Sequence, residues 1–120
     1  MTVPLLLNIS ERMQAIGTLN KFRGSLDELS ILLKDIDKLR PTDHEWEIVG
    51  KAEEISTDDN GKKMVKITWD NDKYLPQKIE LDLKTVQALN DLINSTEEGE
   101  GYQLGQPNIE FLISLKSKLV

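Results

Sequence analysis

Residues 25–41 read SLDELSILLKDIDKLRP, and this stretch determines much of the predicted fold. Ser25 followed three residues later by Glu28 is the sequence signature of a capping box at the start of a helix. Apolar residues then recur at steps of three and four, which place them on one helix face: Leu26, Leu29, Leu33, Ile36 and Leu39. Pro41 disfavours helical geometry at Arg40, so the stretch predicts one amphipathic helix that ends there.

A similar signal precedes this helix. Asn8 followed by Glu11 is a second capping box, and apolar residues at helical spacing follow it as far as Gly24. The sequence therefore predicts an earlier helix that ends near Gly24. The apolar residues 5–7 in front of it form either a short first strand or a lead-in that packs on the core.

Two further helices are predicted in the C-terminal third of the chain. One begins near Asp82 or Leu83 and shows apolar residues at helical spacing. Residues 94–101 follow as an acidic loop that contains glycine. The last helix begins at Pro107, a favoured residue of the first turn, and carries two lysines in its last turn, where they suit the helix dipole.

The central third of the chain changes to a period of two, which is typical of strands. After a single helical turn at residues 42–45, alternating segments run over residues 46–55, 65–69 and 79–83. Asn60-Gly61 between the first two segments is a strong hairpin signal, because both residues tolerate positive φ.

The register of this hairpin has two solutions. A two-residue turn at Asn60-Gly61 would place Ser56 opposite Val65. A three-residue loop, or a bulge at Glu53-Glu54, would place Ile55 there instead and restore an apolar face.

Together these segments predict an α+β fold. The expected order is α-α-β-β-β-α-α, with about four helices packed on one face of a three-stranded antiparallel meander. At 120 residues, the chain 1–120 fits a single domain.

The charge balance limits the classes of partner. The chain has 15 basic and 21 acidic residues and a formal net charge of −6. Nucleic acids and anionic membranes are bound by clustered Lys and Arg, so this balance argues against both. The apolar opening is too short for a membrane span and lacks the features of a signal peptide, so the expected compartment is the cytoplasm.

No arrangement of residues predicts catalysis. The chain has no cysteine, and His44 is its one histidine, between Asp43 and Glu45 in a polar turn. A nucleophile triad and a zinc site both need partners that are missing. With Gly61 at the sixth position of a calcium loop, Ile67 stands where the bidentate glutamate belongs. We expect no catalytic residue, no metal and no cofactor, and therefore a protein that is not an enzyme.

Aromatic residues mark the predicted partner surface. Both tryptophans fall in the predicted sheet region of a chain with only 5% aromatic residues. Core packing is the simplest explanation, but Trp and Tyr also form the hot spots of protein interfaces. The residues that we predict to contact a partner are Trp46, Trp69 and Tyr74.

A cluster of lysines falls on the predicted hairpin at Lys62, Lys63 and Lys66. A solvated face that discourages edge-to-edge aggregation is the simplest explanation. The alternative is a patch that binds a phosphate-bearing ligand.

The order of elements, with the segments SERMQAI (residues 10–16), ITWDNDK (67–73) and IEL (79–81), resembles small accessory proteins of tailed bacteriophages and prophages. The resemblance covers most of the chain. Proteins of this kind have no assigned catalytic residues, so the resemblance implies a phage-borne, non-enzymatic protein. In that case its compartment is the host cell cytoplasm.

These observations favour a non-enzymatic phage or prophage accessory protein that binds a host or phage protein. One alternative is a protein that counters host defence by sequestering a nucleotide-like signal through the lysine cluster. A further alternative is a structural or assembly protein of the virion. The sequence leaves a homo-oligomer open, because the apolar stripe of residues 26–39 or that of residues 109–119 could meet a second subunit.

Overall fold

A computed structural model of the chain describes residues 1–119. Its backbone divides into two compact units: unit 1 comprises Met1–Arg40 and Pro76–Val120, and unit 2 comprises Pro41–Leu75. The prediction of a single domain concerns independent folding. The division into two compact units does not test it, so the single domain stays a prediction.

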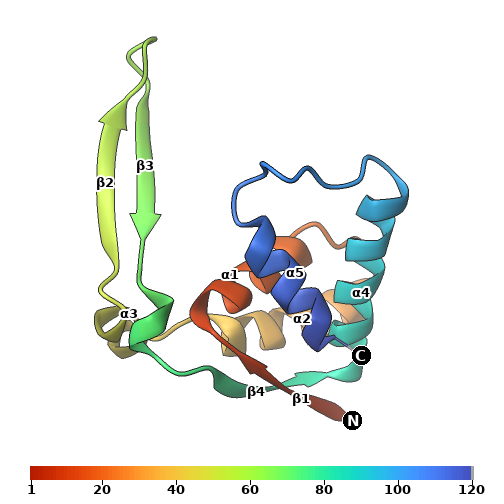
Figure 1. The fold of residues 1–120 in the computed structure, drawn as a ribbon. Helices are drawn as coiled ribbons and strands as arrows, with labels where there is room; N and C mark the ends of the chain where they lie inside the picture. The colour runs from red at the N-terminus through yellow and green to blue at the C-terminus, as the bar shows by residue number, and fades with distance from the viewer. Residues whose placement is uncertain (120) are drawn as a thin grey trace. The chain divides into compact units, whose positions relative to one another are not determined.

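The structure confirms the α+β class. The elements of unit 1 are β1 (Thr2–Leu7), α1 (Ile9–Leu19), α2 (Leu26–Leu39), β4 (Gln77–Asp82), α4 (Leu83–Glu98) and α5 (Ile109–Lys118) (Figure 1). The elements of unit 2 are α3 (Asp43–Ile48), β2 (Ala52–Thr57), β3 (Lys63–Thr68) and the short 3-10 helix η1 (Asn71–Lys73). The order of elements differs from the predicted order because it contains two further elements, β1 and α3.

Both predicted capping boxes are confirmed. The Asn8 side chain accepts a hydrogen bond from the Glu11 N–H at 2.8 Å, and the Asn8 N–H donates to the Glu11 carboxylate at 2.9 Å. Ser25 and Glu28 make the same reciprocal pair at the start of α2. α1 ends at Leu19 rather than near Gly24, with Asn20 as its C-cap, and Phe22 packs on the core after the helix has ended.

The prediction of a three-stranded meander is wrong. β4 pairs antiparallel with β1, with Leu5 opposite Ile79, and within residues 1–119 β2 and β3 form a separate two-stranded sheet. The prediction joined strands that are neighbours in sequence. The apolar alternation of β4 instead matches that of β1, and pairing these two strands puts both apolar faces on the helices.

Unit 1 buries one hydrophobic core between its helices and the β1–β4 sheet. α1 packs against α2, α4 and α5, while α2, α4 and α5 contact the sheet (Figure 1). The buried side chains come from all six elements: Leu5, Leu7, Ala15, Leu19, Leu32, Ile36, Leu39, Leu81, Val86, Ala88, Leu89, Ile93, Leu112 and Leu115. Burial of this apolar surface is the main source of stability in unit 1.

Two boundaries near the C-terminus differ from the prediction. α4 begins at Leu83, with Asp82 as its N-cap, but continues to Glu98, so residues 94–98 are helical instead of a loop. α5 begins at Ile109 rather than at Pro107, after Asn108 with a left-handed φ of 63°. Polar composition predicted the loop, whereas the helix continues through these polar residues, and the Thr96 hydroxyl donates to the Leu92 carbonyl at 3.0 Å.

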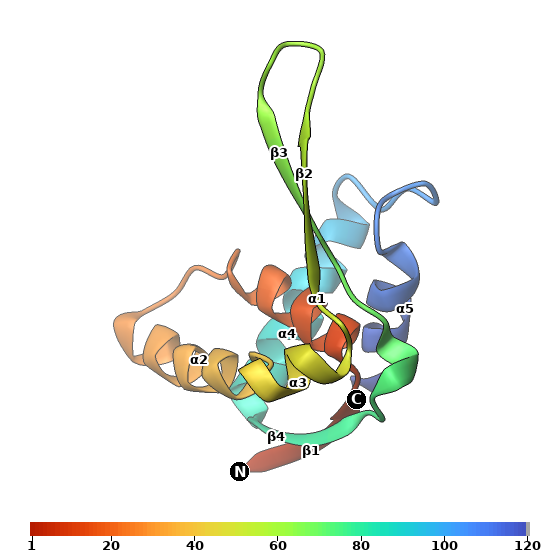
Figure 2. The ribbon, with the colours of Figure 1, turned by 90° about the vertical axis from the view of Figure 1, so that its left-hand side faces the viewer.

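Unit 2 is built on the β2–β3 hairpin (Figure 2). Its loop has three residues between Asp58 and Lys62, which are joined by a 3.0 Å hydrogen bond from the Asp58 N–H to the Lys62 carbonyl. Gly61 supplies the left-handed residue of this loop, with φ 78°. Ile55 lies opposite Val65, so the three-residue alternative is the right one.

Candidate functional site

One face of the β2–β3 hairpin exposes three apolar side chains, which we call the apolar strip: Ile55, Val65 and Ile67. Their exposed fractions are 71%, 60% and 44%. All six residues of β2 are exposed. Such an apolar alternation normally faces a core, and the predicted fold placed helices on it. Its exposure makes the strip the candidate site, because grouped exposed apolar side chains mark interaction surfaces.

The register fixes what surrounds the strip. Successive side chains of a strand point to opposite faces, so three cross-strand pairs share this face: Glu53–Ile67, Ile55–Val65 and Thr57–Lys63. The opposite face carries Ala52–Thr68, Glu54–Lys66 and Ser56–Met64. The strip therefore has an acidic residue at one end and a basic residue at the other.

The hairpin also has two open edges. Within residues 1–119, β2 pairs with β3 alone, and each strand has an outer edge outside this pairing. Strand edges can pair with another chain, and charged side chains discourage such pairing. Two lysines on β3 and two glutamates on β2 serve in this way, so the apolar face is the better binding surface than the edges.

The predicted aromatic residues lie in unit 2 but not on the strip. Trp46 belongs to α3, so its predicted place in a strand is wrong. Its ring meets that of Trp69 edge to face, with centroids 5.4 Å apart, and the Lys51 ammonium lies 4.9 Å from the Trp46 centroid. The Trp69 Nε1–H donates to the Asn71 side chain at 3.2 Å. Tyr74 is half-buried and caps η1.

This aromatic cluster packs unit 2 internally. Both indoles are half-buried, and their rings contact each other. An edge-to-face pair with a cation over one ring is a stabilising arrangement. That these aromatic residues contact a partner stays a prediction.

The structure does not bring the three lysines to one face. Lys62 lies in the hairpin loop, while Lys63 and Lys66 are on β3. Residues three apart on a strand point to opposite faces, so Lys63 flanks the apolar strip and Lys66 lies on the other side. A single phosphate group cannot be held by both.

The remaining polar candidates of the sequence are dispersed. His44 is exposed on α3. In the part of the chain that the structure describes, no group of three or more His, Cys, Asp or Glu side chains is close enough to hold a metal ion. Over residues 1–119, no helix combines the length and the apolar character that crossing a membrane requires.

Unit 1 contains a buried acid that sequence reasoning assigned only to a cap. The Glu11 carboxylate also accepts hydrogen bonds from the Ser114 hydroxyl and the Lys118 ammonium, each at 2.6 Å. Burial on its own would raise the pKa of Glu11. The hydrogen bonds from Asn8, Lys118 and Ser114, with the charge of Lys118, outweigh that effect and lower the pKa below its ordinary value.

Two more buried charged residues join elements of unit 1. The Arg12 guanidinium donates to the Leu39 carbonyl at 2.8 Å and to the Arg40 carbonyl at 3.1 Å, at the C-terminal end of α2. These bonds satisfy carbonyls that the helix end leaves without partners.

Asp35 of α2 performs the same task at the start of α4. Its carboxylate accepts the Asp82 N–H at 2.8 Å and also the Thr85 hydroxyl. Arg12, Asp35 and Glu11 therefore fix helix ends.

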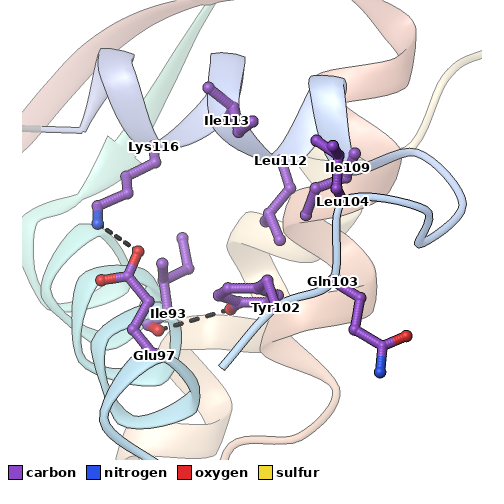
Figure 3. A pocket seen from close by; sticks show the side chains of 9 residues that line it. All are labelled: Ile93, Glu97, Tyr102, Gln103, Leu104, Ile109, Leu112, Ile113 and Lys116. Carbon is purple, nitrogen blue, oxygen red and sulfur yellow. Dashed lines mark hydrogen bonds and ion pairs between the residues drawn. The ribbon is translucent and has the colours of Figure 1, made fainter. Parts of the chain in front are cut away.

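A groove in unit 1 is the second candidate surface. It has a volume of about 370 Å³ and lies between α4, α5 and residues 102–104 (Figure 3). Apolar side chains such as Leu112 line it, and the Tyr102 hydroxyl donates to the Ile93 carbonyl at 3.5 Å. Lys116 and Glu97 form an ion pair across it (Figure 3). Because that lysine is already paired, the groove offers apolar contact rather than recognition of an anion.

Comparisons with known proteins add no relative. The chain matches no family model, no curated protein and no solved structure.

Proposed function

We propose that this chain is a non-enzymatic protein-binding protein and that its contact surface is the apolar strip. The observation that carries the proposal is the exposure of Ile55, Val65 and Ile67 on one face of the hairpin. Desolvation of apolar surface is the dominant favourable term in most protein associations. The partner is a host or phage protein, and the phage or prophage origin and the host cytoplasm belong to the same proposal.

The hairpin itself supports the need for a partner. A two-stranded sheet is only marginally stable in water, and further strands or packing surfaces are usually needed to stabilise it. The strip presents β-branched side chains, which lose little conformational entropy when they are covered. A protein surface placed over the strip would supply the missing side of this small sheet.

The alternatives have less support. Sequestration of a nucleotide-like signal needs several cations on one side, and Lys63 and Lys66 point to opposite faces of β3. A structural or assembly role in a virion is a special case of the same protein-binding proposal.

Photocrosslinking tests the proposal directly. Benzoylphenylalanine in place of Val65 should form covalent adducts with protein when the chain is present in an extract of the cells that produce it. The same group in place of Lys66, on the opposite face, is the matched control and should form far fewer adducts. An Ile67→Asp substitution should abolish the adduct from position 65. Equal yields at the two positions would contradict the proposal.

A further inference from the structure

We propose that the partner on the apolar strip is a second copy of this chain, packed face to face and antiparallel. This inference rests on the proposed function, because it names the protein that the strip binds. It is carried by the order of side chains along the strip, which is complementary to itself when one copy is turned end to end.

The complementarity follows from the cross-strand pairs. The row Ile55–Val65 lies at the centre of the face, with Glu53–Ile67 on one side and Thr57–Lys63 on the other. A two-fold axis through the central row, perpendicular to the strands, superimposes the apolar centres. It also places the row Glu53–Ile67 of each copy over the row Thr57–Lys63 of the other copy, so Glu53 lies diagonally across from Lys63 of the other copy. Two such charge pairs, related by symmetry, set the direction of packing.

The parallel alternative lacks this match. With the axis along the strands, each row lies over the same row of the other copy with β2 over β3, so Glu53 lies diagonally across from Glu53 of the other copy. At the far end, Lys63 lies diagonally across from Lys63 of the other copy in the same way. Like charges at both ends oppose this arrangement, and the antiparallel one removes both clashes.

The small size of this face indicates that the dimer is weak. Three rows of side chains bury less than the roughly 1,200 Å² of a standard interface. Interfaces of this small size are typical of weak, transient complexes, so we expect a reversible dimer with a dissociation constant on the order of 10–100 μM. Such a dimer forms where many copies are concentrated in one place.

Charge reversal provides the test. Glu53→Lys and Lys63→Glu each put like charges at both ends of the antiparallel dimer, so each variant alone should dimerise at least about tenfold more weakly. In an equal mixture, a Glu53→Lys chain meets a Lys63→Glu chain with opposite charges at both ends. Sedimentation velocity over a concentration series should show dimer in the mixture and monomer in each variant alone.

The opposite face gives the control. Glu54→Lys combined with Lys66→Glu reverses a cross-strand pair while keeping it complementary, and this variant should dimerise as the wild type does. A wild type that stays monomeric at 500 μM would overturn the inference, and so would a dimer that neither single charge reversal weakens.

The crosslink from position 65 separates this inference from the proposed function. An adduct with the mass of two chains supports both. An adduct with a different protein, together with a monomeric wild type, overturns the dimer but leaves the proposed function in place. Absence of any adduct contradicts both.

Discussion

Glu11 and Lys118 form an ion pair at 2.6 Å that joins the first turn of α1 to the end of α5, across 107 residues of sequence. The Glu11 side chain is fully buried, whereas the Lys118 side chain is 31% exposed. The same carboxylate closes the capping box with Asn8. One side chain therefore starts a helix and fixes the position of another.

Glu11→Gln should destabilise unit 1. Glutamine keeps the size of the side chain but loses the charge that Lys118 and Ser114 face. We expect a loss of about 1.5–3 kcal/mol in the free energy of unfolding, the range for hydrogen bonds to charged groups. Urea titration followed by far-UV circular dichroism measures it. Glu97→Gln, at an exposed ion pair with Lys116, is the control and should cost at most about 1 kcal/mol.

The same glutamate predicts a pH dependence. Its pKa in the folded state is below the value of 4.5 for an unperturbed glutamate, so protonation favours the unfolded state. The stabilisation from Glu11 is complete above pH 4.5 and is lost as the pH falls through the lower, folded-state pKa. Below pH 4.5 the Glu11→Gln variant should lose less stability than the wild type; parallel curves for the two proteins would rule this contribution out.

Asp35→Ala should destabilise unit 1 strongly. The substitution leaves the Asp82 N–H and the Thr85 hydroxyl without their acceptor inside the protein. Each buried polar group without a partner costs about 1–3 kcal/mol. Asp37→Ala, on the exposed side of the same helix, removes only a surface pair with Arg40 and should change stability by less than about 1 kcal/mol. If the two variants were equally stable, Asp35 would have no role in fixing α4.

Gly61→Ala should weaken the hairpin. Gly61 has φ 78°, and a left-handed residue with a Cβ costs about 1–2 kcal/mol. Both tryptophans of the chain lie in unit 2, so their fluorescence reports the unfolding of that unit. We expect the fluorescence midpoint in urea to fall. An unchanged midpoint would mean that another residue sets the loop.

Gly17→Ala should have the opposite effect. Gly17 lies in the last turn of α1, and apart from the adjoining backbone of that helix a Cβ added there meets nothing within 4 Å. Alanine is favoured over glycine in a helix by about 0.5–1 kcal/mol. Urea titration followed by circular dichroism should show a gain of that size. A loss of stability would indicate a steric conflict at this position.

Local signals predicted most of the helices. A capping box needs residues only three positions apart, so the starts of α1 and α2 could be read from Asn8 and Ser25. The sequence signal for the hairpin loop was also local, because the left-handed position of this loop favours a glycine, here Gly61. The second role of Glu11 depends on a lysine 107 residues away, and no pattern in the sequence connects the two.

Strand pairing and exposure were harder to predict. The alternation around Ile79 fits β1 and β3 equally well, and only the helices that cover β1 and β4 distinguish them. The strip residues show the same alternation as a buried strand, so the sequence placed Ile55 and Val65 toward helices. Their exposure is visible only in the structure, and for that reason the candidate site could not be found earlier.

The accessibility of position 65 tests the central claim most directly. The chain has no cysteine, so Val65→Cys and Met64→Cys each introduce a single thiol on opposite faces of β3 at similar exposure, 60% and 55%. Maleimide labelling rates are compared between dilute buffer and an extract of the producing cells. A protein-covered strip predicts that the extract slows labelling at position 65 several-fold more than at position 64. Equal slowing at the two positions would contradict the assignment of the apolar strip as the binding surface.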